Sequence, residues 1–184
     1  ENSDSINLDI KTTEFLTDKI LQNCENQASV VMFTTSSWGG NATLVSTTSW
    51  RVNTTGSVPV QNLLSGTSYI VKNAGVRPNT IAMGIDVYDA LKLNTDLTNR
   101  IQYVGYAFAG KDIMASLFDI PQNRIFVGES MVDTGQEGIA VSLTTMWGVD
   151  LWLGYMAPSP SIKTLSAAYV FRHSMDGNPY RTKK

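Results

Sequence analysis

Cysteine and histidine are almost absent from this chain, which contains only Cys24 and His173 of these two types among 184 residues. A single cysteine excludes an intrachain disulfide and a cluster of thiolates. A zinc site would need aspartate and glutamate for most of its ligands, which is unusual. Cys24 falls within a helical pattern, where we expect a small, half-buried apolar residue. We therefore predict no metal site and no cofactor.

The chain also has a small net charge and no long apolar run. The formal net charge is −2 and the isoelectric point is near 5.3, whereas a nucleic-acid-binding protein normally has a basic face and a high isoelectric point. No apolar run approaches the roughly 20 residues that span a bilayer, and the first residues show no signal-peptide pattern. These absences argue against electrostatic binding of nucleic acid and against a membrane partner.

The motifs of common catalytic sites are also missing: there is no phosphate-binding loop, dinucleotide fingerprint, nucleophile elbow or paired-histidine zinc motif. The segment MVDTGQE (residues 131–137) does contain Asp-Thr-Gly at Asp133, the nucleophile loop of aspartic proteases, in which two carboxylates share one proton. Only one copy is present, and Gln136 stands where that family has a small residue. Because Asp and Gly are ordinary turn formers, we predict a surface turn between strands and no catalytic residue. A dimeric aspartic protease that uses Asp133 is the enzymatic alternative.

Tryptophan, in contrast, occurs four times. Such side chains can form a platform for a sugar or a base, but in β-rich regions they more often pack in a core or an interface. We predict core or interface positions, with a carbohydrate-binding module as the alternative. The four residues are Trp38, Trp50, Trp147 and Trp152.

The first part of the chain predicts one long helix over residues 7–33, because apolar residues recur there at helical spacing with polar residues between them. Such a helix is longer than most globular helices, and we expect a rod along which something else packs. Residues 34–55 are rich in Ser and Thr and lose the helical periodicity, which indicates a strand pair or extended loops.

A second helix is predicted to begin at a cap formed by Ser57, with Pro59 in its first turn and Gly75 as its C-cap. Its expected apolar stripe comprises Val60, Leu63, Leu64, Tyr69 and Ile70.

The segment GVRPNTIAMGIDVYDAL (residues 75–91) predicts a strand at 80–83, a break at Gly84 and a helix at 86–93 capped by Asp86. This layout is common at nucleotide and nucleophile sites, but no Lys, Ser, Cys or His lies at the turn. We therefore predict that Gly84 serves the backbone, through a positive φ or a close neighbour.

The remaining elements complete an α+β pattern without internal repeats. A helical turn is expected to start at Asn94 or Thr95 and to extend to Arg100, and a helix covers residues 111–118. Strands are predicted at residues 124–127, 139–143, 149–156 and 166–173.

The order and spacing of these segments resemble the major capsid protein of tailed bacteriophages of the prophage type, whose fold lineage includes encapsulin shells and the herpesvirus capsid floor. The runs that carry this resemblance are FLTDKILQNCENQASVVMF, NATLVSTTSW, VPVQNLL, GVRPNTIAMGIDVYDALKLNTDLTNRI, LFDIPQNRIFVGES, TTMWGVDLWLGYMAPSPS and LSAAYVF.

The resemblance implies a Hong Kong 97-type fold. Residues 1–56 would then hold the spine helix and strands of the peripheral (P) domain, residues 57–157 the axial (A) domain, and residues 158–184 the return to the P-domain. The N-terminal arm, the extended E-loop and the final P-domain strands of such proteins have no counterpart in this sequence by this comparison.

The resemblance also implies a function. The chain would be a structural subunit that self-assembles, through hexamers and pentamers, into an icosahedral head shell that encloses phage DNA without sequence-specific binding. Its other partners would be scaffold or portal proteins. The protein would be assembled in the bacterial host cytoplasm and reside in the virion. An encapsulin-type nanocompartment shell is the alternative.

Overall fold

A computed structural model describes residues 8–38, 50, 57–102, 110–135, 138, 140–159, 161 and 163–169. Most of the predicted strand pair at 34–55 and the end of the strand predicted at 166–173 lie outside these residues. The described elements follow in the order α1 Leu8–Phe33, η1 Thr35–Trp38, α2 Pro59–Ala74, β1 Thr80–Gly84, α3 Ile85–Leu93, α4 Thr95–Ile101, α5 Lys111–Phe118, η2 Gln122–Arg124, β2 Ile125–Gly128, β3 Met131–Asp133, β4 Leu143–Thr145 and β5 Leu151–Gly154.

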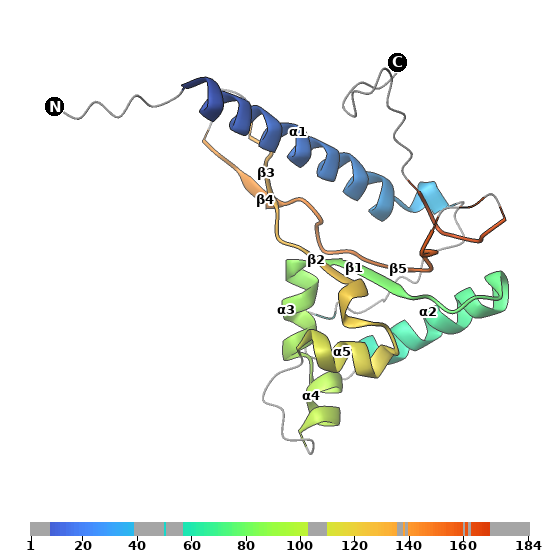
Figure 1. Ribbon diagram of the computed structural model, residues 1–184. Helices are drawn as coiled ribbons and strands as arrows, with labels where there is room; N and C mark the ends of the chain where they lie inside the picture. The colour runs from blue at the N-terminus through green and yellow to red at the C-terminus, as the bar shows by residue number, and fades with distance from the viewer. Residues whose placement is uncertain are drawn as a thin grey trace.

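The fold is α+β, as predicted, and it has two unequal parts (Figure 1). Helices α2 to α5 gather with a small sheet into a compact body, whereas α1 runs as a rod above it, with the β3–β4 hairpin beneath. The long helix predicted over residues 7–33 is confirmed as α1, which has 26 residues. No helix in the described part of the chain is both long enough and apolar enough to span a membrane.

The sheet of the body has the strand order β2-β1-β5. Its central strand, β1, pairs in parallel with β2 and antiparallel with β5, so that Ile81 lies opposite Ile125 on one side and Leu153 on the other. Every residue of β1 is buried. A strand buried on both faces reads as a continuous apolar run, and this explains why Thr-Ile-Ala-Met-Gly shows no alternation.

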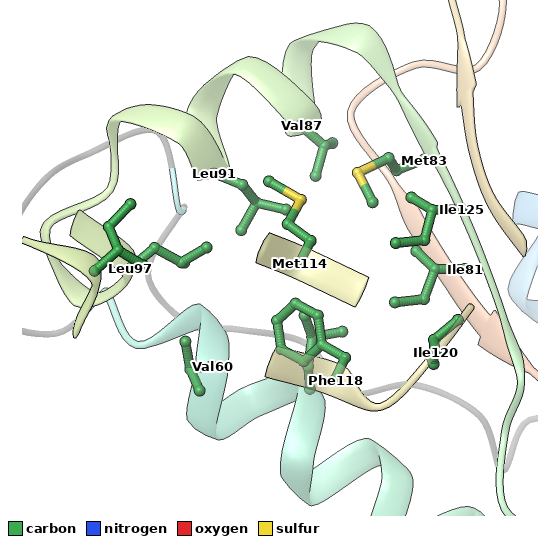
Figure 2. Close-up of a cluster of buried hydrophobic side chains, with 12 residues drawn as sticks. Val60, Ile81, Met83, Val87, Leu91, Leu97, Met114, Phe118, Ile120 and Ile125 are labelled. Atoms are coloured by element: carbon green, nitrogen blue, oxygen red, sulfur yellow. The ribbon is translucent and has the colours of Figure 1, made fainter. Parts of the chain in front are cut away.

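One core joins the sheet to the helices (Figure 2). Ile81 and Met83 of β1 meet Leu91 of α3, Leu97 of α4 and Met114 of α5, which are all at most 1% exposed. Full burial of such a side chain contributes about 1.5–3 kcal/mol relative to its exposure. The core therefore draws on almost every element from α2 to β2, and further members are Val60, Leu63, Val87, Ile101, Phe118, Ile120 and Ile125.

Helix α2 begins and ends close to where the sequence predicts, but its cap differs. Gly75 adopts a left-handed conformation with φ of 70° and its N–H donates to the Val71 carbonyl at 2.9 Å, which confirms the C-cap. The N-cap is Val58 rather than Ser57. The Ser57 hydroxyl instead accepts a hydrogen bond from the Asn94 side chain at 2.7 Å, because the buried Asn94 amide requires partners. Two members of the predicted stripe, Leu64 and Tyr69, are nearly half exposed.

Gly84 ends β1 and is the N-cap of α3. Its φ of −72° and ψ of 159° are ordinary extended values, so the predicted positive φ is wrong. The predicted close neighbour is confirmed, because a Cβ at this position would collide with the carbonyl oxygen of Gly148. Asp86 does not cap α3. Its carboxylate accepts from the Thr145 hydroxyl at 3.2 Å and thereby ties α3 to β4.

The next helix boundaries agree with the sequence. Asn94 caps α4 by accepting the Asp96 N–H at 2.9 Å. Helix α5 covers Lys111–Phe118, and Asp119, in a left-handed conformation with φ of 56°, ends it. The strand predicted at 124–127 is confirmed as β2, one residue later than expected.

The strand predictions after β2 are less accurate. Residues 140–142 carry no strand, and β4 begins only at Leu143; β3 falls in a segment where we predicted a turn. The strand predicted at 149–156 shortens to β5, because Val149 still belongs to the preceding turn. Residues 166–169 form no strand, and Ala167 contributes one N–H bond to the Tyr155 carbonyl at 2.8 Å.

Candidate functional site

The seam between α1 and the rest of the protein is where polar and aromatic side chains from distant parts of the chain meet. At its centre is Glu25 of α1. Its carboxylate accepts the Ser130 hydroxyl at 2.9 Å and the Trp147 indole N–H at 2.9 Å. Ser130 precedes β3 and Trp147 follows β4, so the Glu25 side chain connects α1 to both strands at the open end of the hairpin.

Two further polar contacts extend this seam along α1. The Gln22 side-chain amide donates to the Met131 carbonyl at 2.9 Å, one turn before Glu25. The Ser29 hydroxyl, one turn after Glu25, donates to the Asn26 carbonyl at 2.8 Å and lies 3.4 Å from the Met146 carbonyl. The helix is thus held by hydrogen bonds made by its polar side.

Aromatic rings close the C-terminal end of the seam. The ring of Phe33 lies 5.8 Å from that of Trp147, and the rings of Trp38 and Trp152 are 5.6 Å apart. Both pairs are tilted, as is favoured for aromatic contacts. The Trp38 indole N–H also donates to the Met32 carbonyl at 2.8 Å.

All four tryptophans are therefore packed, as predicted. Trp50 lies against the core of the body, and its indole nitrogen is buried without a hydrogen-bond partner among the described residues. Trp147 lies against the Gly128 backbone, where no side chain would fit. The predicted core or interface role is confirmed, and these rings do not form a shared open platform for a ligand.

Asp133 lies at the end of β3 and closes the hairpin. Its Oδ1 atom accepts the N–H groups of Gly135 and Ser142, both at 2.9 Å. These two hydrogen bonds lower the pKa of the Asp133 carboxyl below its ordinary value of 3.8. The predicted surface turn between strands is confirmed for the segment that follows Asp133, whereas residues 131–133 form β3. The Asp133 side chain takes the N–H of Ser142, which also explains the missing strand at 140–142.

Cys24 is exposed, so the predicted half-buried position is wrong. It lies on the side of α1 that turns away from the seam, and the body leaves that side uncovered. No group of three or more potential metal ligands occurs in the described ranges. A shallow depression lies on the outer face of α2, and it is lined by Gln61, Leu64, Ser65, Ser68, Tyr69 and Lys72.

The functional reading of the sequence missed the residues that hold the seam. Glu25 looks like one of several charged residues spaced along a solvated helix, and Ser130 like a loop serine. Their partnership joins positions 105 residues apart. Trp147 was the one available signal, because a tryptophan in a short loop indicates a packed contact.

Comparison with known proteins finds two similar phage proteins, one by sequence and one by fold. The chain is 29% identical over 118 residues to the major capsid protein of Burkholderia phage BcepMu, a match that covers 64% of this chain and 36% of that protein. Its fold is similar to the crystal structure of a phage-related protein from Bordetella bronchiseptica RB50, with a TM-score of 0.72 and 22% sequence identity over 88% of this chain and 52% of that one. No protein-family model matches the sequence.

By these likenesses the chain resembles a phage major capsid protein in sequence and a phage-related protein in fold. The chain spans about half the length of the similar structure and little more than a third of the capsid protein that it matches.

Proposed function

We propose that the chain is a major capsid subunit of a tailed bacteriophage, with the Hong Kong 97-type fold. The observation that carries this proposal is the 29% identity, over 118 residues, to a protein named as a major capsid protein. The arrangement of Asp133 agrees with a structural role, because its carboxylate is engaged by two backbone N–H groups of its own hairpin. We therefore assign no catalytic, cofactor-binding or metal-binding residue.

We further propose that residues 57–157 form the A-domain. The body supports this boundary: its fully buried core residues run from α2 to β2, β5 packs against them, and both Ser57 and Ala157, at the two limits, are buried. Residues 1–56, with α1 as the spine helix, and residues 158–184 then belong to the P-domain. The polar seam at Glu25 is the contact between the spine helix and the rest of the chain.

In this function the subunits assemble through hexamers and pentamers into an icosahedral head shell, and scaffold or portal proteins are their other partners. The shell is built in the bacterial host cytoplasm and becomes the virion capsid. The DNA is enclosed without sequence-specific binding. The net charge of −2 supports this last point, since a nucleic-acid-binding protein normally has a basic face.

The test is expression of the complete gene that encodes this chain, followed by sedimentation and negative-stain electron microscopy. Closed shells, or rings of five and six subunits, are expected. A product that remains a small soluble oligomer at all concentrations and salt conditions contradicts the proposed function. Shells filled with a host enzyme instead of DNA would identify the encapsulin-type alternative.

A further inference from the structure

The turn that joins β4 to β5 lies between α1 and the body (Figure 1). It comprises residues 146–149, which we call the bridging turn. Strand β4 belongs to the hairpin beneath α1, whereas β5 belongs to the sheet of the body. The bridging turn therefore passes from one part of the molecule to the other.

On one side the bridging turn contacts a single stripe of α1. The Trp147 indole N–H donates to the Glu25 carboxylate at 2.9 Å, and the Trp147 ring lies 5.8 Å from the ring of Phe33. Between these two contacts, the Ser29 hydroxyl lies 3.4 Å from the Met146 carbonyl oxygen. Glu25, Ser29 and Phe33 follow one another at intervals of four, so the bridging turn lies along about two turns of the helix.

On the other side the bridging turn lies against two glycines of the body. The Trp147 ring covers the backbone of Gly128, and the Gly148 carbonyl oxygen lies beside Gly84. Gly84 and Gly128 are paired in register where β1 and β2 end, and both are buried. A Cβ at either of them would collide with the bridging turn. Gly148 itself has a φ of 60°, in the left-handed region that favours glycine.

This junction lies at the carboxyl ends of two parallel strands. In open α/β sheets that end is the usual place for a ligand. Here the chain's own turn occupies it, and the Thr145 hydroxyl, directly before the turn, donates to Asp86 in the first turn of α3 at 3.2 Å. The strand, glycine and helix of residues 80–93 thus hold a segment of the same chain.

We propose that the bridging turn is a conformational coupling device, which holds α1 in place only while the turn is seated against Gly84 and Gly128. In the seated state the Trp147 indole is positioned to donate to Glu25 and to contact Phe33. When the turn leaves the two glycines, these contacts are lost together and α1 is released. Because coupling between two sites is reciprocal, release of α1 also loosens the turn.

The position of the Trp147 ring makes this coupling tight. The same rigid ring covers Gly128 and carries the N–H that bonds to Glu25. Such a hydrogen bond tolerates a change in length of only about 0.3 Å, whereas a methyl group added at Gly128 needs about 3.5–4.0 Å to the ring carbons. The atoms nearest to that methyl group all belong to the Trp147 ring. A change at Gly128 therefore reaches α1 through one side chain.

The first experiment measures hydrogen exchange of the α1 amides, by mass spectrometry, in the whole 184-residue chain. Gly128→Ala displaces the Trp147 ring. Gly75→Ala is the matched control, because it strains a glycine of the body with a φ of 70° where a Cβ meets no atom within 4 Å. Gly128→Ala should accelerate exchange in α1 by about tenfold or more, since the lost hydrogen bond involves a charged group. Gly75→Ala should change it by less than about twofold.

Gly84→Ala repeats the test from the second glycine, and it decides the matter if Gly128→Ala fails to fold. A Cβ at Gly84 meets the Gly148 carbonyl oxygen, so this substitution also unseats the bridging turn. We expect accelerated exchange in α1 here as well, although Gly84 ends a strand of the body. Circular dichroism and continued protection of the β1 amides verify in each variant that the body stays folded.

The second experiment determines whether Glu25 and Gly128 act through the same contact. Glu25→Ala removes the acceptor of the Trp147 indole N–H. If the bridging turn couples the two positions, the double variant with Gly128→Ala should accelerate α1 exchange by no more than about twofold beyond the stronger single variant. Independent positions would instead multiply their fold-changes.

Three results overturn the inference: unchanged exchange of the α1 amides in the glycine variants, equal acceleration by Gly128→Ala and Gly75→Ala, or fold-changes of Glu25→Ala and Gly128→Ala that multiply in the double variant. The inference concerns contacts within one chain and does not rest on the proposed function. A complete gene that yields no shells would refute the proposed function and leave the coupling intact.

Discussion

The body and α1 use the same kind of residue in opposite ways. In the body, the apolar residues of the helices point into a shared core, and Leu91 of α3 is completely buried. In α1, Leu21 is 55% exposed, and the side chains that hydrogen-bond to other described elements include Gln22, Glu25 and Ser29. The body is therefore held by burial of apolar surface, whereas α1 is held by a few hydrogen bonds and the ring contact of Phe33.

This difference distinguishes the part of the described chain that buries its apolar side chains from the part that leaves them exposed. A net hydrogen bond contributes about 0.5–1.5 kcal/mol, or somewhat more when one group is charged, and each fully buried leucine contributes more than that. The body thus has an apolar core of its own. Helix α1, in contrast, leaves several of its apolar side chains exposed, among them Leu16, Ile20 and Val31.

The largest contrast is expected from the same substitution in the two regions. Leu91→Ala removes a fully buried side chain and should destabilise the protein by about 2–5 kcal/mol, because it leaves a cavity in the core. Leu21→Ala on α1 should change stability by no more than about 0.5 kcal/mol. Urea denaturation, followed by far-ultraviolet circular dichroism, measures both. Equal losses would show that α1 belongs to the same packed core.

Gly84→Val tests the contact that joins the body to the loop after β4. The added side chain would meet the Gly148 carbonyl oxygen, and one of the two segments must move. We expect a loss of about 1–3 kcal/mol, as is typical of overpacking, measured as a lower melting temperature. Since φ at Gly84 is −72°, backbone strain does not add to this loss. An unchanged melting temperature would mean that the loop containing Gly148 moves aside without a measurable loss of stability.

Glu25→Ala tests the polar seam alone. It removes the acceptor of the Ser130 hydroxyl and the Trp147 indole N–H, and leaving such donors without a partner costs about 1–3 kcal/mol. Because the core is untouched, we expect α1 to detach before the body unfolds. Hydrogen exchange of the α1 amides should accelerate while the amides of β1 stay protected. The exposed Glu14, changed to Ala, is the control on the same helix, and equal acceleration in both variants would refute the role of Glu25.

The smallest effect is expected at Asp133, which is exposed. Its pKa is lowered in the folded protein by the N–H groups of Gly135 and Ser142, so its stabilising effect is present above pH 3.8, the ordinary value, and is lost as the pH falls through the lower folded value. Nuclear magnetic resonance should show that the Gly135 and Ser142 amide signals shift in that range. Asp133→Asn should abolish the titration and leave the assembly state unchanged. A peptide-cleaving activity that disappears in this variant would instead support the protease alternative.

Local chemistry accounts for the parts of the fold that the sequence predicted well. The helical spacing of residues 7–33, the left-handed glycine at Gly75 and the cap at Asn94 each act within a few neighbouring residues. The errors have the opposite cause. Ser57 and Asp86 are good caps by residue type, but each has a distant partner, Asn94 and Thr145 respectively, that engages its side chain instead.

The sequence by itself determined where the helices α1 to α5 form, that an apolar run makes a strand at residues 80–83, and that a turn follows Asp133, since these depend on periodicity and on short-range hydrogen bonds. Only the tertiary structure decided which face of α1 turns inward. The spacing of its apolar residues specifies a helix but not what covers it, and the choice depends on Ser130 and Trp147, more than 100 residues away in the chain. Side-chain contacts at that separation depend on how the elements pack against one another, which no local pattern encodes.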